Sequence, residues 1–320
     1  MTVTCSAGPD SFSFGNNPFL HHEQEREIEN MSNIKYFALA GQGKPFQAAV
    51  EPKNARVNAV WMDGSVVEGC MFNEACWYLK SCKEPGVVKH NSDKVMFFIG
   101  GDMENPENLN ARIEIWIEND KLTLTKTSAV FVPGSAAHGN MEVKGLAKPF
   151  FRYTCHLNTA DYETSPAEAK AAPGTYANHY VEKYARPDGT FPEAPEGFIK
   201  FLLYLDDKRL KGAPYAEAVW FCTTNDTGPA PHIHDDFDEF IGFIGSDPEH
   251  PEELNGEIDF YIEDEKITVT KSCLVYIPRG LTHSPLYVPR LERPIIHFSG
   301  GNGGGYARKG DYGDDNMFKM

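Results

Sequence analysis

The sequence predicts an all-β protein built from two similar halves, and three observations support this expectation. A segment of 42 residues occurs twice, apolar and polar residues alternate within each copy, and glycine and proline are frequent, with 28 and 22 among 320 residues. Alternation with a period of two is typical of strands with one buried face. Short strands separated by frequent turns favour two β-sandwiches or barrels.

The two copies indicate an internal duplication. Residues 97–138 and 242–283 align without a gap, 145 positions apart, so that His138 meets His283. Roughly two in five aligned positions are identical, which is typical of a repeated structural unit. Each copy carries an alternating stretch, ARIEIWIE or GEIDFYIE, followed by a β-branched stretch, KLTLTKTSAVFVP or KITVTKSCLVYIP. Each copy therefore predicts a series of strands.

We expect five segments along the chain. They are an N-terminal extension (1–33), a first β domain (34–157), a linker (158–197), a second β domain (198–305) and a glycine-rich flexible tail (306–320). The linker begins with SPAEAKAAPGTY, which predicts a short helix, and continues through a proline-rich stretch. The glycine run near the end of the chain lacks the lysine of a phosphate-binding loop.

Composition limits the partners and the compartment. The net charge of −16 disfavours nucleic acids and anionic membranes as partners, because both are themselves negative. We find no apolar run long enough for a secretory signal or a membrane span. The seven cysteines form no CxxC pair, which indicates free thiols. We therefore expect a cytoplasmic protein that acts on a small molecule.

The stretch GPAPHIHDDFDEFIGFIG, residues 228–245, predicts a metal site. Its two histidines stand one residue apart, so an extended chain turns both imidazoles to the same side. Glu239 follows on the next strand, and the sequence PRGLTH at 278–283 returns a third histidine after a turn. Three imidazoles and one carboxylate suit a divalent metal of intermediate softness. The candidate ligands are His232, His234, Glu239 and His283. Asp238 would replace the glutamate if the register slips by one.

The pattern HxHxxxxE followed by PxGxxH resembles the two-part motif of the cupin superfamily. The resemblance covers both halves and implies two tandem cupin barrels of the double-stranded β-helix, or jelly-roll, type. It also implies that the four candidate ligands bind one divalent metal ion per chain. Iron, manganese, nickel and zinc are all compatible with three nitrogens and one oxygen. Because cupins often pair through edge strands, the resemblance further implies a homodimer.

The first copy has lost most of this motif. At the positions aligned with three of the four ligands it carries Val87, Lys89 and Lys94, and it keeps only His138. Ammonium groups repel a divalent cation and cannot bind it while protonated, so we expect no metal here. A shifted register would recruit His90, which still leaves only two histidines. Two roles remain open: a structural half that carries the dimer interface, or a small-anion site formed by Lys89, Lys94 and His138.

Other residues are candidates for chemistry around the metal. His297 alternates with apolar neighbours and can serve as an acid or a base inside the second barrel, or can be a histidine satisfied at its rim. Strand parity places two apolar side chains on the Glu239 side, and two tyrosines and an arginine lie within reach as donors. The candidate pocket residues are Ile241, Phe243, Tyr261, Tyr276 and Arg279.

The resemblance implies a metal-dependent enzyme for a small oxygenated organic molecule, with one active site in the second barrel. Four protein ligands on an octahedral metal leave two adjacent positions for a substrate, or for a substrate beside dioxygen. We favour an oxidoreductase similar to the cupin dioxygenases. The alternative is a lyase, decarboxylase or isomerase that uses the metal as a Lewis acid. Oxalate decarboxylase carries the motif in both halves, which counts against that reaction. A non-catalytic metal- or ligand-binding bicupin is the second alternative.

Overall fold

The structure is a computed structural model that describes residues 31–44 and 49–306. The described chain folds into four antiparallel sheets, and the 3-10 helix η1 (Ser32–Tyr36) is the only helical element within it. The predicted all-β fold of two jelly-roll halves is confirmed. The predicted N-terminal extension and glycine-rich tail lie almost wholly outside the described residues.

The first half consists of a six-stranded and a five-stranded sheet. Their strand orders are β12-β8-β5-β10-β3-β2 and β11-β4-β9-β6-β7. The main strands are β2 (Arg56–Met62), β3 (Phe72–Tyr78), β4 (Cys82–Lys89), β5 (Lys94–Gly100), β6 (Asn108–Ile117), β7 (Asp120–Lys126), β8 (Ser128–Val132), β9 (His138–Lys144) and β10 (Phe150–His156).

The second half repeats this plan with a six-stranded sheet, β1-β18-β15-β20-β14-β13, and a three-stranded sheet, β17-β16-β19. Its strands are β13 (Ile199–Leu205), β14 (Ala216–Phe221), β15 (Glu239–Gly245), β16 (Glu253–Ile262), β17 (Glu265–Lys271), β18 (Cys273–Ile277), β19 (His283–Leu291) and β20 (Ile295–Gly301). Each strand from β15 to β20 begins 145 residues after its counterpart among β5 to β10. The internal duplication is thus visible strand by strand.

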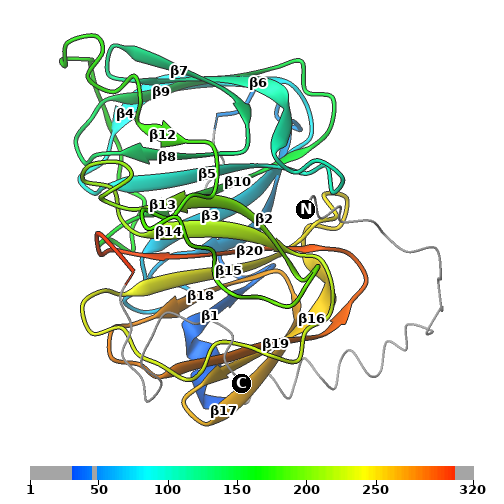
Figure 1. The fold of residues 1–320 in the computed structure, drawn as a ribbon. Helices are drawn as coiled ribbons and strands as arrows, with labels where there is room; N and C mark the ends of the chain where they lie inside the picture. Colours follow the sequence, from blue (N-terminus) through cyan, green and yellow to red (C-terminus); the bar gives the residue numbers. More distant parts are fainter. Residues whose placement is uncertain (1–30, 45–48, 307–320) are drawn as a thin grey trace.

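Short strands from elsewhere in the chain complete the sheets. The strand β1 (Phe37–Leu39) lies within the range predicted for the first domain, but it pairs with β18 of the second half. In Figure 1 this dark blue strand lies among the yellow and orange ones. The linker contributes β11 (Ser165–Pro166) and β12 (Tyr180–Val181), which pair with β4 and β8.

The prediction of a partly helical linker is wrong, because residues 158–197, all described, contain no helix. Pro166 and Pro173 lack the N–H groups that a helix would use, and β4 and β8 offer backbone partners to the extended chain instead.

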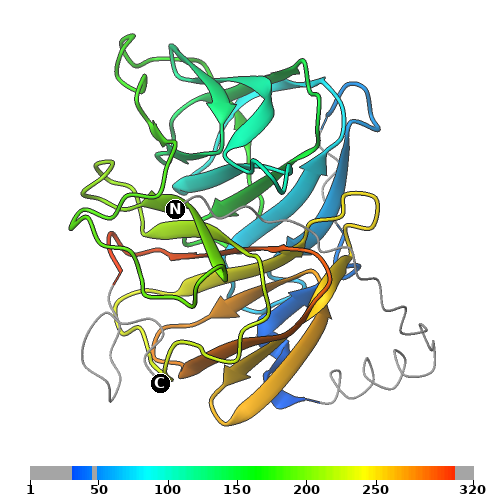
Figure 2. The ribbon, with the colours of Figure 1, turned by 45° about the vertical axis from the view of Figure 1, so that its right-hand side comes forward.

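The two six-stranded sheets pack face to face and form a core shared by both halves (Figures 1 and 2). This shared core includes Val95, Phe97 and Ile99 of β5 and Phe240 and Ile244 of β15. Because side chains alternate along a strand, the intervening residues face the separate interior of each half. Lys94 begins β5 and Glu239 begins β15, so an amine and a carboxylate occupy equivalent positions in the two interiors.

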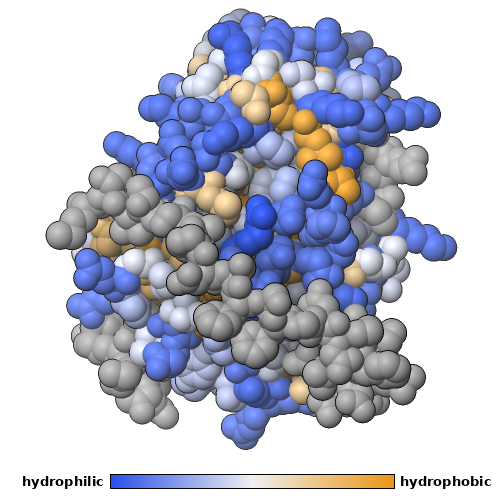
Figure 3. Space-filling view, turned by 90° about the vertical axis from the view of Figure 1, so that its right-hand side faces the viewer, coloured by the Kyte–Doolittle hydropathy of each residue, from blue (hydrophilic) through white to orange (hydrophobic). Residues whose placement is uncertain are grey.

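The outer surface is mostly hydrophilic on the face shown in Figure 3, in keeping with the net charge of −16. In the described part of the chain we find no helix that is long and apolar enough to cross a membrane. Five buried cysteines are free thiols: Cys70, Cys76, Cys82, Cys155 and Cys273. Cys222 is disulfide-bonded, so the prediction of free thiols throughout is wrong.

Candidate metal centre

The backbone brings the predicted ligands together inside the second half. Glu239 is the first residue of β15 and His283 the first of β19, while His232 and His234 lie in the loop before β15. His232 and His283 form an antiparallel bridge, in which each N–H donates to the other's carbonyl at 3.1 Å. The N–H of Gly280, which follows Pro278 in the turn, donates to the carbonyl of His234 at 2.7 Å. The turn and the bridge therefore hold the three histidines beside one another.

The four side chains converge on one small volume. One ring nitrogen from each histidine lies within 4.8 Å of the other two. The Oε2 atom of Glu239 lies 3.1 Å from Nε2 of His283 and 3.4 Å from Nε2 of His234. All four residues are buried, with at most 7% of their surface exposed. Three nitrogens and one oxygen in this arrangement suggest a divalent metal.

The hydrogen bonds of the rings show that the donor set fits a cation. Nδ1 of His232 lies 2.8 Å from the carbonyl oxygen of Ala230, and Nδ1 of His283 lies 3.1 Å from that of Leu281. A carbonyl only accepts, so each Nδ1 carries a proton, which leaves Nε2 as the ring nitrogen that can bind a metal. Burial lowers the pKa of His232 to about 3, which leaves its ring neutral at pH 7. Imidazoles whose Nε2 atoms are oriented in this way beside a carboxylate form a donor set that fits a divalent cation.

Arg279 does not line the metal site, contrary to the prediction. Its guanidinium makes a two-pronged ion pair with Asp238, with distances of 3.1 Å from Nε to Oδ1 and 3.1 Å from Nη2 to Oδ2. Its backbone N–H donates to the same carboxylate at 3.0 Å, and 54% of its side chain is exposed. Asp238, the alternative ligand, is thereby held on the surface turn. The preceding residue, Phe237, stacks on His234 with ring centroids 4.3 Å apart.

The two predicted tyrosines also face elsewhere. Tyr276 belongs to the core shared by the two halves, because it alternates with Val275 and Ile277, which face the second interior. Tyr261 alternates with buried neighbours on β16 and is half-buried near Tyr287, with ring centroids 6.1 Å apart. Parity along each strand carries both rings away from the metal side, so neither is a pocket residue.

His297 and the two predicted apolar residues do share the interior with Glu239. Ile241 and Phe243 are buried there. The His297 ring stacks between Phe221 and Phe243, with centroids 4.7 and 4.9 Å away, and its Nδ1 lies 3.1 Å from the carbonyl of Gly242. Burial lowers the pKa of His297 to about 4, so the imidazole is neutral at pH 7.

A buried carboxyl group on the same side, that of Glu217, was not predicted from the sequence. Glu217 begins the run of β14 residues that includes Val219 and Phe221, both of which face the second interior. The hydroxyl group of Tyr184 donates to it at 2.8 Å. Burial raises the pKa of Glu217, which favours its protonated form. The alternation of residues 217, 219 and 221 along one strand was the sequence pattern that could have identified Glu217 as facing this interior.

The first half shows a different set at the equivalent positions. Lys94 and His138 face its interior, and Nδ1 of His138 lies 2.9 Å from the carbonyl of Ala136, as His283 does from Leu281. Lys89 does not join them, which corrects the predicted anion site. A β-bulge between Glu84 and Val87 shifts the register of β4 by one residue relative to the second half: Val88, and not Val87, lies opposite His138, so the buried His90 takes the place equivalent to that of His234.

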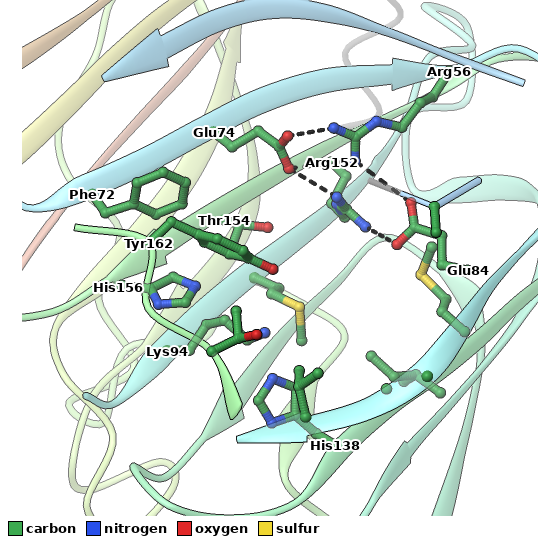
Figure 4. Close-up of a pocket in the computed structure, with 18 of the residues that line it drawn as sticks. Arg56, Phe72, Glu74, Glu84, Lys94, His138, Arg152, Thr154, His156 and Tyr162 are labelled. Atoms are coloured by element: carbon green, nitrogen blue, oxygen red, sulfur yellow. Dashed lines mark hydrogen bonds and ion pairs between the residues drawn. The ribbon is translucent and has the colours of Figure 1, made fainter. Parts of the chain in front are cut away.

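A cavity of about 230 Å³ occupies this first interior (Figure 4). One end carries two arginines and two glutamates that pair with one another, and the other carries Lys94 with His138 and His156. The sequence had singled out Lys94 and His138, but not His156, Tyr162 or the glutamates. His156 shares its face of β10 with Arg152 and Thr154, which also line the cavity.

Comparison with known proteins supports the fold. No protein-family profile matches the sequence, and no curated protein matches it. One similar solved structure, from work on the substrate binding mode and a reaction specificity switch of oxalate decarboxylase, is 11% identical with a TM-score of 0.51; the match covers 84% of this chain and 80% of that one. Another, of Bacillus subtilis oxalate decarboxylase studied for its Mn(II) centres, is 9% identical with a TM-score of 0.52, covering 94% and 87%. At these identities the likeness establishes the arrangement of both halves.

Proposed function

We propose, on the premise that the chain is a bicupin with one intact and one degenerate metal motif, that it is a metal-dependent enzyme for a small oxygenated organic molecule. The observation that carries this proposal is the convergence of three imidazole nitrogens and one carboxylate in the second barrel. A seed-storage role would not need this complete, buried donor set, whereas a non-catalytic metal-binding bicupin would keep it and is the second alternative.

The residues of the second barrel would divide the work as follows. His232, His234, Glu239 and His283 would hold the metal, and the carbonyls of Ala230 and Leu281 orient two of the rings. A bound divalent ion supplies Lewis acidity, and iron, manganese or nickel adds redox chemistry. The single carboxylate leaves the centre net positive, which attracts an anionic or enolisable oxygen within a protein of charge −16.

Two ionisable groups on the same interior can move protons. His297 is neutral and can accept a proton from a substrate, while Glu217 tends to keep its own proton. Ile241 and Phe243 surround these groups with apolar surface. These contacts support two reaction classes. We favour a dioxygenase-like oxidation, because the metal donor set lies in an apolar interior. The presence of a proton acceptor and a proton donor, His297 and Glu217, supports the alternative, a non-oxidative lyase or isomerase reaction.

The remaining expectations are also proposals. We infer a cytoplasmic homodimer with a small-molecule substrate and with neither nucleic acid nor membrane as a partner. The acidic surface and the analogy with cupin dimers support them. Light scattering of the purified protein measures the oligomeric state.

Oxygen uptake tests the proposed reaction class. We expect the metal-loaded protein to consume oxygen with at least one member of a panel of β-diketones, catechols, flavonols and hydroxy acids, and His283→Ala to abolish this uptake. The matched control Arg279→Ala should keep it, because Arg279 binds Asp238 and not the metal. Turnover under nitrogen without oxygen uptake would reject the oxidative class and support the lyase or isomerase.

A further inference from the structure

The cavity of the first barrel has no part in the proposed metal chemistry, yet it is built from charged and polar groups. We propose that this cavity is a second ligand site, which binds a small planar hydroxycarboxylic acid with its carboxylate on Lys94 and its hydroxyl group on the neighbouring imidazoles. The inference does not rest on the proposed function, because it concerns the other barrel and requires no metal.

Lys94 provides the anchor for the carboxylate. It is only 8% exposed, lines the cavity, and has no carboxylate within 4.0 Å among the described residues. A buried ammonium without a counter-ion is costly. Burial and the charge of Arg152 lower the pKa of Lys94 to about 7, against the opposite effect of Glu84 and Glu74. An arriving carboxylate would restore the full positive charge by supplying the missing partner.

The arginines of the cavity are already committed, which limits the ligand to one negative charge. Arg152 pairs with Glu74 at 2.9 Å and with Glu84 at 2.8 Å, and Arg56 pairs with the same two carboxylates. Two guanidinium groups and two carboxylates form a neutral, closed network at one end of the cavity (Figure 4). Among the described residues that line the cavity, Lys94 is the one cation without such a partner.

The imidazoles beside Lys94 favour a hydroxyl group on the ligand. Nδ1 of His90 lies 2.7 Å from the carbonyl of Glu163, and Nδ1 of His138 lies 2.9 Å from that of Ala136. Both Nε2 atoms therefore carry lone pairs, and both are buried without a hydrogen bond. Burial and the nearby Lys94 lower the pKa of both rings, so they remain neutral acceptors at pH 7. Of the two, His138 lines the cavity, so a ligand hydroxyl group can donate to its Nε2 and satisfy an atom that burial has deprived of water.

The walls favour a small, flat body. Phe72 contacts Trp61 with ring centroids 4.8 Å apart and Tyr162 with centroids 5.1 Å apart, and all three line the cavity. Aromatic rings pack well against another planar ring. The volume of about 230 Å³ is below the usual range of about 300–1,000 Å³ for ligand pockets, which indicates a small molecule. Tyr162 is 36% exposed, so the cavity reaches solvent.

Calorimetric titration with the three hydroxybenzoates tests the proposal on the full-length protein. We expect one equivalent of at least one isomer to bind, roughly threefold to tenfold more tightly than benzoate, which lacks the hydroxyl group. The neutral methyl ester of the same hydroxybenzoate should bind at least about tenfold more weakly than the free acid, because the ester cannot pair with the ammonium group of Lys94. A carboxylate can also bind a metal, so the same titration is repeated with His283→Ala, which should bind the acid unchanged.

Lys94→Met is the decisive variant. It shortens the side chain by only one atom and removes a buried unpaired charge, so we expect it to fold, as checked by its thermal melting. We expect it to bind the acid at least about tenfold more weakly. Lys89→Met is the matched control. It removes a lysine charge from β4 that does not line the cavity, so this variant should bind the acid normally. Unchanged affinity in Lys94→Met, loss of binding in His283→Ala, or no saturable binding to the wild type at millimolar concentration would each overturn the proposal.

The pH dependence provides a second readout. The charged and titratable groups around Lys94 are Glu74, Glu84, His90, His138, Arg152 and His156. The lowered pKa values of the three histidines and of Glu84 and the raised pKa of Arg152 keep these groups in one charge state between pH 7 and 9, whereas the pKa of Lys94, about 7, lies at the edge of this range. Affinity should fall by about tenfold per pH unit above pH 7, and a flat profile would contradict the role of the ammonium.

Discussion

Replacing Lys94 by methionine should stabilise the protein, and the structure sets the size of the effect. The amine lies in the first interior, 8% exposed and without an ion pair among the described residues. Burial is the main cause that lowers its pKa from the usual 10.5 to about 7. Each pKa unit corresponds to about 1.4 kcal/mol, so the unpaired amine costs the folded state about 4 kcal/mol at pH 7. Replacing such groups by apolar residues typically recovers about 1–4 kcal/mol.

The sign of the pH dependence follows from the same pKa. Between pH 7 and 10.5 the unfolded chain keeps the proton of this lysine and the folded protein has lost it, so wild-type stability rises with pH in this window. The advantage of Lys94→Met should therefore shrink by about 3 kcal/mol between pH 7 and pH 9.5.

Urea unfolding of the wild type and Lys94→Met at pH 7 and 9.5 measures both effects. Lys89→Met serves as the control. Lys89 carries the same charge, but it is half-buried on β4 and does not line the cavity, so its replacement should change stability little. Equal stability of the wild type and Lys94→Met at pH 7, or a gap that does not change with pH, would refute the reasoning.

Three further predictions concern packing, charge and the metal. Arg152→Ala leaves the buried Glu74 and the half-buried Glu84 short of a partner and should lower the free energy of unfolding by about 3–5 kcal/mol. Arg112→Ala, which breaks an exposed pair with Glu114, should change it by less than about 1 kcal/mol; urea unfolding measures both, and equal effects would contradict the importance of the Arg152 network. Gly242→Ala should destabilise by at least about 1–3 kcal/mol, because its Cβ would lie 2.0 Å from the Phe298 ring; an unchanged melting temperature would show that the shared core has room. Glu239→Gln should weaken metal binding by at least about tenfold in a competition assay with a chelator, and Arg279→Ala should leave the affinity unchanged. A larger loss of affinity in Arg279→Ala than in Glu239→Gln would place the metal near the surface turn.

The strand positions were largely predictable because the duplication is undistorted. The same spacing that aligns His138 with His283 separates β9 from β19, and alternation within β16 separates buried Phe260 and Ile262 from their neighbours. The metal cluster was also readable, since an HxH on extended chain and a histidine after a turn bring three rings to one side.

The remaining features depend on contacts between distant segments. The β-bulge before Val87 places Val88, and not Val87, opposite His138, and no local pattern distinguished Lys89 from His90 at that point. Tyr276 was assigned to the pocket because a core shared by two sheets is not visible from one strand. Arg279 is fixed by its ion pair with Asp238 across 41 positions, and only the folded chain shows that pairing.

Anomalous diffraction at the metal edge, on crystals of protein purified without chelators, tests the central claim most directly. We predict one peak per chain, bounded by the Nε2 atoms of His232, His234 and His283 and by the carboxylate of Glu239. A peak beside Lys94 and His138 in the first barrel, or imidazoles turned outward with no peak between them, would contradict it.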